Sequence, residues 1–220
     1  MNFKRILLLS GHYGSGKTNI ALSLARLLKQ THERVTIADV DIVNPYFRTS
    51  DSRRELEDAG IRLICSEFAG SNVDLPALPA SIYAVTDDPT QAAVIDVGGD
   101  DRGALALGRL RDRILEEDDY EMLFVINHFR PLTKTPELAM DVMREIEAAG
   151  GIPFTAVINN SNLGPETTAQ DVLDSAAYAS EVCRQSGLPL KMTTVHESLY
   201  PQLKGKIENL FPIGLQKKIQ

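Results

Sequence analysis

Residues 11–18 read GHYGSGKT, and this stretch directly follows a short apolar run at residues 6–9. It satisfies the pattern G-x-x-x-x-G-K-[ST], in which glycines allow backbone N–H groups to turn inward around phosphate oxygens. A segment of helical period begins near residue 17, and the positive end of its dipole would face the same loop. A strand before the loop and a helix after it are the setting that the pattern requires, so we expect a phosphate-binding site here.

Short apolar, β-branched runs alternate along the chain with longer segments of helical spacing. Strands are predicted at residues 5–10, 34–39, 61–66, 92–97, 121–127, 154–160 and 188–194. Helices are predicted at about residues 17–30, 51–59, 103–116, 135–149 and 167–186, with a weak helical pattern at 80–86 inside a proline-rich surface segment. This alternation predicts an α/β fold with a doubly wound, mainly parallel sheet flanked by helices. With 220 residues we expect a single domain over residues 1–220.

Composition excludes several classes of protein. No apolar run approaches the roughly 20 residues of a membrane span, and the apolar start is too short for a secretory signal peptide. A net charge of −7 opposes binding to nucleic acid, which depends on Lys and Arg neutralising phosphates. The two cysteines, Cys65 and Cys183, have neither a CxxC nor a zinc-ligand spacing. We therefore expect a cytoplasmic protein with reduced thiols and with neither nucleic acid nor membrane as a partner.

The loop itself supplies most of the candidate site residues. Lys17 would reach the β and γ phosphates of a nucleotide, and the Thr18 hydroxyl would bind Mg²⁺. The remaining candidates for nucleotide binding in this stretch are Gly11, Gly14, Ser15, Gly16 and Asn19.

Carboxylates follow two further predicted strands. Asp39 and Asp41 lie at the carboxyl end of the strand at 34–39, the edge where ligands bind in open α/β sheets, although a helix cap or a solvated turn would use the same residues. Asp96 ends the strand at 92–97 and forms a D-x-x-G pattern with Gly99. An aspartate in this position can hold a water on Mg²⁺, and the glycine lets a backbone N–H approach the γ phosphate.

With these motifs in this order, the chain resembles the P-loop ATPases of the MinD/ParA type, which include the nitrogenase iron protein and the CobQ/CobB-like nucleotide-binding domains. The likeness covers roughly residues 4 to 195. The resemblance implies that Asp41 orients or activates the attacking water and also lies near the metal, that Asp96 belongs to the Mg²⁺ shell, and that Asn44 makes a switch contact.

Two departures from this family pattern affect the expected assembly. Many relatives carry a lysine after the first loop glycine, which reaches the phosphate of a partner subunit, and this chain has His12 there. A mostly neutral histidine is a poor substitute for that lysine, so a monomer and a homodimer both remain open. Residues 97–120 contain no cysteine, which excludes a bridging iron–sulfur cluster like that of the iron protein.

The choice of base depends on Asn159 and Asn160, which end the strand at 154–160. In related ATPases an asparagine at this position contacts adenine, while Asn is also a common turn residue. The guanine-reading pattern N-K-x-D would need Lys and Asp where this chain has Asn160 and Asn162. ATP is therefore the expected nucleotide in preference to GTP.

Other polar and aromatic residues have open assignments. Arg130, after the strand at 121–127, could meet a phosphate or an acidic partner, or only water. Tyr46, Phe47 and Arg48 suit a protein interface or, in the case of the aromatics, the core. The tail from residue 204 invites comparison with a membrane-binding amphipathic helix, but Pro212 and Gly214 interrupt it.

The sequence therefore predicts a Mg²⁺-dependent ATPase that acts as a nucleotide switch on an unidentified protein partner or a metallocentre. Its switch segments would be residues 41–49 and 97–104. An ATP-dependent small-molecule kinase or ligase of the CobQ/CobB or dethiobiotin-synthetase kind is the alternative enzyme. A nucleotide-gated binding module that does not hydrolyse ATP is the alternative without catalysis.

Overall fold

A single parallel sheet of eight strands organises the computed structural model, which describes residues 1–40, 52–65, 80–99 and 107–215. The strand order is β3-β2-β4-β1-β5-β6-β7-β8, and every neighbouring pair is parallel. The strands are β1 (Ile6–Ser10), β2 (Val35–Asp39), β3 (Arg62–Cys65), β4 (Ala92–Asp96), β5 (Tyr120–Ile126), β6 (Ala156–Asn159), β7 (Leu190–His196) and β8 (Leu210–Ile213). The predicted fold class is confirmed.

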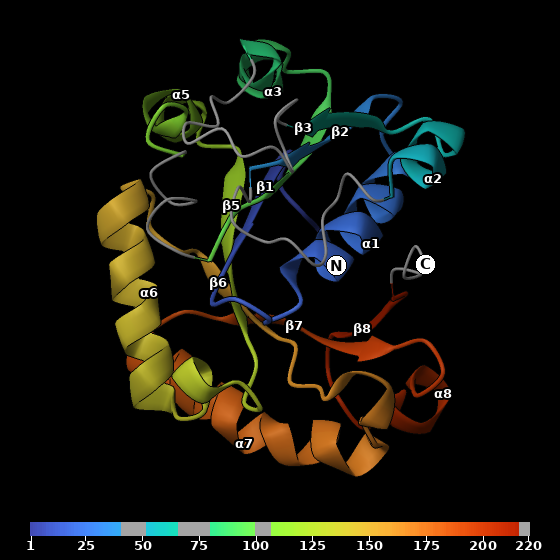
Figure 1. Ribbon diagram of the computed structural model, residues 1–220, viewed down its shortest axis with the longest axis vertical. Helices are drawn as coiled ribbons and strands as arrows, with labels where there is room; N and C mark the ends of the chain where they lie inside the picture. The colour runs from blue at the N-terminus through green and yellow to red at the C-terminus, as the bar shows by residue number, and fades with distance from the viewer. Residues whose placement is uncertain (41–51, 66–79, 100–106, 216–220) are drawn as a thin grey trace, which may run out of the picture.

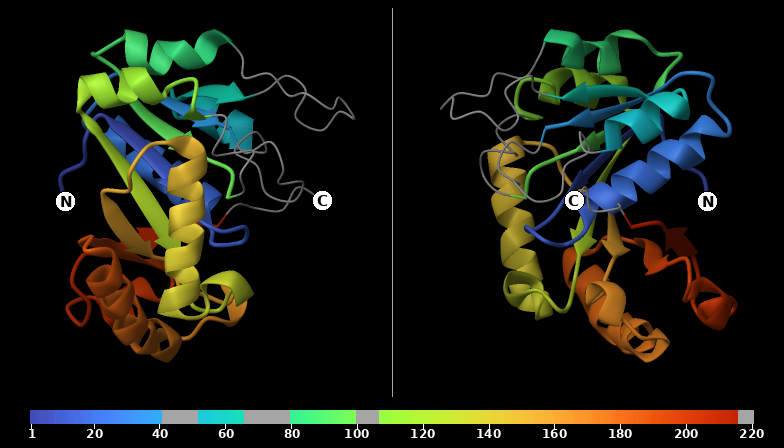
Figure 2. Two further views of the ribbon diagram at one scale, coloured as in Figure 1. Left: turned by 90° about the vertical axis from the view of Figure 1, so that its left-hand side faces the viewer. Right: turned by 45° about the vertical axis from the view of Figure 1, so that its right-hand side comes forward.

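Helices connect the strands and lie on both sides of the sheet (Figure 1). The α-helices are α1 (Lys17–Lys29), α2 (Arg53–Asp58), α3 (Ala84–Asp87), α5 (Arg111–Glu117), α6 (Pro136–Gly150), α7 (Ala169–Ser186) and α8 (Tyr200–Leu203). Short 3-10 turns are η2 (Ala80–Tyr83), η3 (Pro131–Thr133) and η4 (Gly164–Glu166). Figure 2 shows α1 and α2 on one side of the sheet and α6 on the other.

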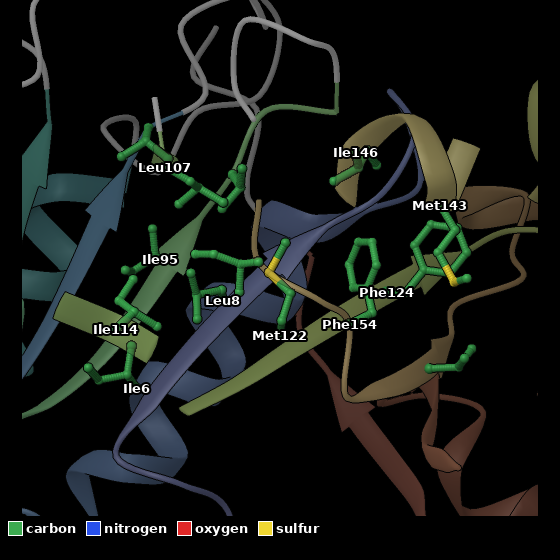
Figure 3. Close-up of a cluster of buried hydrophobic side chains, with 14 of the residues drawn as sticks. Ile6, Leu8, Ile95, Leu107, Ile114, Met122, Phe124, Met143, Ile146 and Phe154 are labelled. Atoms are coloured by element: carbon green, nitrogen blue, oxygen red, sulfur yellow. The ribbon is translucent and has the colours of Figure 1, made fainter. Parts of the chain in front are cut away.

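Alternation along the central strand β1 divides the core between these two sides. Ile6 and Leu8 pack into a cluster with α5, α6 and α7 (Figure 3). Leu7 and Leu9 point the opposite way, into a cluster with α1. Because both faces are covered, all five residues of β1 are buried, as the continuous apolar run predicted.

The predicted strands are all present, with ends within about two residues of the expected positions. Of the predicted helices, the one at 103–116 is observed as α5, beginning at Arg111, and residues 103–106 lie outside the described part of the chain. Cys65 and Cys183 are free and half-buried, as expected for reduced thiols.

The strand β8 was not predicted from the sequence. It lies within the segment that was compared with an amphipathic helix and adds to the edge of the sheet beside β7. Pro212 is compatible with this position because an edge strand can leave the side of its missing N–H unpaired. Among the described residues, no helix combines the length and apolar character needed to cross a membrane.

Candidate functional site

The glycine-rich loop leaves the carboxyl end of β1 and enters α1 with a backbone that only glycine accommodates. Gly14 and Gly16 adopt φ angles of 75° and 92°. A Cβ on Gly16 would lie 2.2 Å from the Asn160 amide nitrogen, and one on Gly11 would lie 2.3 Å from the Val125 carbonyl oxygen. The glycines expected to shape a phosphate cradle are therefore required by sterics at these positions.

Polar groups inside this loop are buried and directed toward its interior. Lys17 is only 5% exposed, and its ammonium donates to the carbonyl oxygens of Gly11 at 2.8 Å and His12 at 3.3 Å. The Ser15 hydroxyl is buried and has no hydrogen-bond partner among the described residues. The first turn of α1 contains no acidic residue. A phosphate would satisfy the Ser15 hydroxyl and the positive end of this helix together.

Thr18 and Asp96 meet next to the loop, because β4 lies beside β1 and its last residue pairs with Leu9. The Thr18 hydroxyl donates to a carboxylate oxygen of Asp96 at 2.8 Å, and both side chains are buried. Hydroxyl and carboxylate oxygens are the donors that Mg²⁺ takes when it shares its shell with water and substrate phosphates. These residues fit Mg²⁺, and the described residues contain no cluster of three His, Cys, Asp or Glu that would hold a metal by protein ligands alone.

Gly99, three residues beyond Asp96, packs directly against the loop. A Cβ at this position would lie 2.2 Å from the Gly11 carbonyl oxygen and 2.9 Å from backbone atoms of His12 and Tyr13. The chain after β4 therefore lies directly against the loop backbone, and the predicted approach of the Gly99 N–H to a γ phosphate stays a prediction.

Asn160, predicted to contact the base, braces the loop from the end of β6. Its amide nitrogen donates to the Ser15 carbonyl oxygen at 2.6 Å, and its oxygen accepts from the Thr194 hydroxyl at 2.5 Å. Asn159 is fully buried, donates to the Ser175 hydroxyl at 2.9 Å and accepts from Ser161 at 2.7 Å. Asn160 thus lies at the loop, while Asn159 points into the packing between β6 and α7.

A cavity of 560 Å³ extends from the loop to the carboxyl ends of β7 and β8. Its volume falls in the range of roughly 300–1,000 Å³ that is typical of small-molecule sites. Loop residues, including Lys17 and Thr18, line one end, while Val172, Val195 and Ile213 make the other end apolar. The site offers a cationic region for phosphates beside an apolar region for a flat ring.

The positive charge in the site comes from Lys17 and Arg130, because the surroundings of His12 disfavour protonation of its imidazole. Burial lowers the pKa of His12 below its ordinary value, and the charges of Lys17 and Arg130 lower the pKa further, against the opposing effect of the Tyr13 backbone. His12 is therefore neutral near pH 7.

Several predicted residues lie outside the described part of the chain: Asp41, Asn44, Tyr46, Phe47 and Arg48. Asp39 is described, and it is buried at the end of β2 in register with Asp96. The end of β2 therefore lies next to the strand that carries Asp96. The role proposed for Asp41 stays a prediction.

The site also contains residues that were not selected from the sequence. These are Thr194 and His196, which line the cavity. Arg130, which the sequence identified as a residue that could meet a phosphate, also lines the cavity and contacts the glycine-rich loop. Thr194 and Arg130 lie at or after the ends of predicted strands, and from this position the sequence allows them to be placed at the ligand-binding edge of the sheet. Ile213 and Leu215 had no such signal, because β8 was not predicted.

A comparison with protein families places most of the chain in a nucleotide-binding family. The model of the CobQ/CobB/MinD/ParA nucleotide binding domain matches residues 6–171, which include the loop, Asp96, Gly99, Asn159 and Asn160. No curated protein sequence matches the chain.

Solved structures share the fold at low sequence identity. FtsY from Mycoplasma mycoides is 16% identical with a TM-score of 0.58 over 89% of this chain and 61% of that one. FtsY from Thermotoga maritima is 17% identical with a TM-score of 0.60, over 88% of this chain and 62% of that one. The signal recognition particle 54 kDa protein from Aeropyrum pernix, solved with GDP, is 16% identical with a TM-score of 0.53, over 87% and 41%. This chain thus spans about three fifths of the length of the two FtsY chains and about two fifths of the length of the third protein. The likeness concerns the fold alone.

Proposed function

Because this chain belongs to the CobQ/CobB/MinD/ParA nucleotide binding domain family, we propose that it binds ATP with Mg²⁺ and hydrolyses it as a nucleotide switch. The buried contact between Thr18 and Asp96, 2.8 Å long and next to Lys17, carries this proposal. It brings together a hydroxyl, a carboxylate and an ammonium group where the glycine-rich loop meets the start of α1.

In the proposed reaction the loop amides and Lys17 hold the β and γ phosphates in line with an attacking water. Thr18, and Asp96 through water, would hold Mg²⁺, which would supply positive charge next to the phosphate oxygens. Gly99 would direct its backbone N–H at the γ phosphate, and Asp41 would orient the water. Loss of the γ phosphate would release the segments at 41–49 and 97–104 and signal to a protein partner or a metallocentre.

The proposed preference for ATP rests on amides at the base end of the cavity. Asn162 donates to the Asn160 carbonyl oxygen at 2.8 Å and accepts from the Gly164 backbone at 3.0 Å. Each of these two bonds uses half of the capacity of the group, so one N–H and one lone pair of Asn162 remain for the N7 and N6 positions of adenine. Guanine recognition by a carboxylate would need an acidic residue, which Asn162 is not.

The first test is phosphate release from ATP and from GTP with Mg²⁺, together with ATP affinity by calorimetry. Lys17→Ala should weaken ATP binding by about tenfold or more, because it removes charge-assisted hydrogen bonds to phosphate, and turnover should cease. Asp41→Ala should keep ATP bound while turnover falls sharply. Lys29→Ala, at the far end of the same helix α1, is the control.

Each departure from this result points to a different function. Binding that depends on Lys17 without any turnover would reject the switch ATPase and favour an acceptor-requiring kinase or ligase, or a binding module. Turnover of GTP faster than ATP would reject the proposed base preference.

A further inference from the structure

Arg130 reaches the glycine-rich loop from the segment that follows the neighbouring strand β5. Its Nε donates to the Gly14 carbonyl oxygen at 2.8 Å. The guanidinium also covers the Gly14 α-carbon, since a Cβ there would lie 3.4 Å from Nε and 3.5 Å from the central guanidinium carbon. The hydrogen bond joins residues 116 positions apart in the chain.

The segment that carries Arg130 is held by a buried set of hydrogen bonds. Asn127 is fully buried, and its side-chain oxygen accepts from the Phe129 backbone at 3.0 Å. Its carbonyl oxygen accepts from the Arg130 backbone at 3.1 Å and from the Thr133 hydroxyl at 2.7 Å. Because the backbone is fixed in this way, less conformational entropy is lost when the Arg130 side chain binds a ligand.

The charges around Arg130 favour an anion in the cavity. Arg130 and Lys17 both line the cavity, and its described lining includes no Asp or Glu. None of the ion pairs among the described residues involves Arg130. With Nε occupied by Gly14, the two terminal nitrogens form the fork that binds phosphate oxygens in a bidentate manner.

We propose that Arg130 is a phosphate-binding residue supplied by the same chain, with its terminal guanidinium nitrogens on the polyphosphate of the bound nucleotide. This inference rests on the proposed nucleotide binding and adds a cation from the loop after β5 to that site. It removes the need for a cation from a second subunit, since Lys17 and Arg130 together provide two positive charges at the loop.

The test compares the affinities of ATP, ADP and AMP by competition against a labelled ADP, with the full chain and Mg²⁺. Arg130→Gln should weaken ATP binding by about tenfold to a hundredfold, and AMP binding by clearly less. Arg130→Lys keeps the positive charge but lacks the two-nitrogen fork, so its ATP affinity should lie between those of Arg130→Gln and the unchanged chain. Arg144→Gln, which removes an exposed arginine on α6, is the control and should bind all three nucleotides normally.

Two results would overturn the inference while leaving nucleotide binding intact. One is unchanged ATP affinity in Arg130→Gln. The other is an equal loss for ATP, ADP and AMP together with a lower melting temperature of the free protein, which would make Arg130 a brace for the loop only. Failure of the unchanged chain to bind any of these nucleotides would instead overturn the proposed function.

The source of the cation is tested separately by repeating the ATP titration over a wide range of protein concentrations. If Arg130 acts within its own chain, ATP affinity stays constant at concentrations where sedimentation shows only monomer. Affinity that appears only where dimers form would contradict this assignment.

Discussion

At the scale of single residues, backbone contacts limit what the site tolerates, and Gly99 is a clear case. Its α-carbon faces the Gly11 carbonyl oxygen and the peptide between His12 and Tyr13, all of them backbone atoms of the loop. Backbone atoms cannot rotate away as the end of a flexible side chain can. A methyl group at position 99 must therefore move either the end of β4 or the loop.

We expect Gly99→Ala to lower the stability of the protein by about 1–3 kcal/mol, the usual cost of overpacking. ATP affinity should fall with it, because the displaced loop holds the phosphates. Chemical denaturation and calorimetry measure the two effects. Gly214→Ala is the matched control, since a Cβ there would meet only a Glu197 carboxylate oxygen at 3.7 Å. Equal stability and affinity in both variants would show that the loop and β4 move apart freely.

The residues that could be located from the sequence are those whose roles depend on local spacing. Lys17 and Thr18 belong to one continuous pattern, and Asp96 ends a strand that the apolar run identifies. The brace between Asn160 and Ser15 was not foreseen, because it depends on how the end of β6 is placed against a loop 145 residues earlier. Arg130 shows the same limit: its position after a strand was visible, but its bond to Gly14 was not.

At the scale of elements, α7 fixes the segment after β5 that carries Arg130. Tyr178 of α7 is buried, and its hydroxyl donates to the Thr133 carbonyl oxygen in η3 at 2.6 Å. Burial raises the pKa of Tyr178 well above its usual value, against the smaller opposite effect of this hydrogen bond. The phenol therefore remains a donor at neutral and moderately alkaline pH.

Tyr178→Phe should destabilise the fold by about 1–2 kcal/mol, since it leaves the buried Thr133 carbonyl oxygen without its donor. The expected signature is a lower denaturation midpoint with an unchanged slope. Tyr200→Phe is a suitable control because Tyr200 is partly exposed and its hydroxyl takes part in none of the hydrogen bonds among the described residues. An unchanged midpoint in Tyr178→Phe would mean that water replaces the hydroxyl without cost.

The elements predicted from the sequence are those with strong periodicity. The strand β8 lacks such periodicity and was not predicted. Its four residues, LFPI, include Pro212, which interrupts the helical pattern of the tail. The N–H groups of Thr193 and Glu197 in and after β7 donate to carbonyl oxygens of Asn209 and Ile213, so the pairing makes no demand on the nitrogen of Pro212. Only the presence of the β7 edge makes this segment a strand, and single-sequence patterns do not contain that partner.

At the scale of the whole molecule, the parallel sheet places the candidate ligand contacts among the described residues at the carboxyl ends of its strands. β1 is flanked by β4 and β5, so the loop, the Asp96 pair and the Arg130 segment meet around the centre of the sheet. β6, β7 and β8 extend the same edge toward the apolar end of the cavity. The cations Lys17 and Arg130 line this edge in a chain whose net charge is −7. Binding an anionic nucleotide here should therefore stabilise elements from both halves of the sheet.

A ligand that binds only the folded state at 100 times its dissociation constant stabilises it by about 2.7 kcal/mol. At about 2–4 °C per kcal/mol for a chain of this size, MgATP should raise the melting temperature by about 5–11 °C. Lys17→Ala should lose half of this shift or more at the same ATP concentration, because a tenfold loss of affinity lowers the stabilisation from about 2.7 to about 1.4 kcal/mol. Thermal scans at one fixed protein concentration make the comparison, since self-association would also change the melting temperature. A shift that persists undiminished in Lys17→Ala would place the nucleotide away from the glycine-rich loop and contradict the site assembled around it.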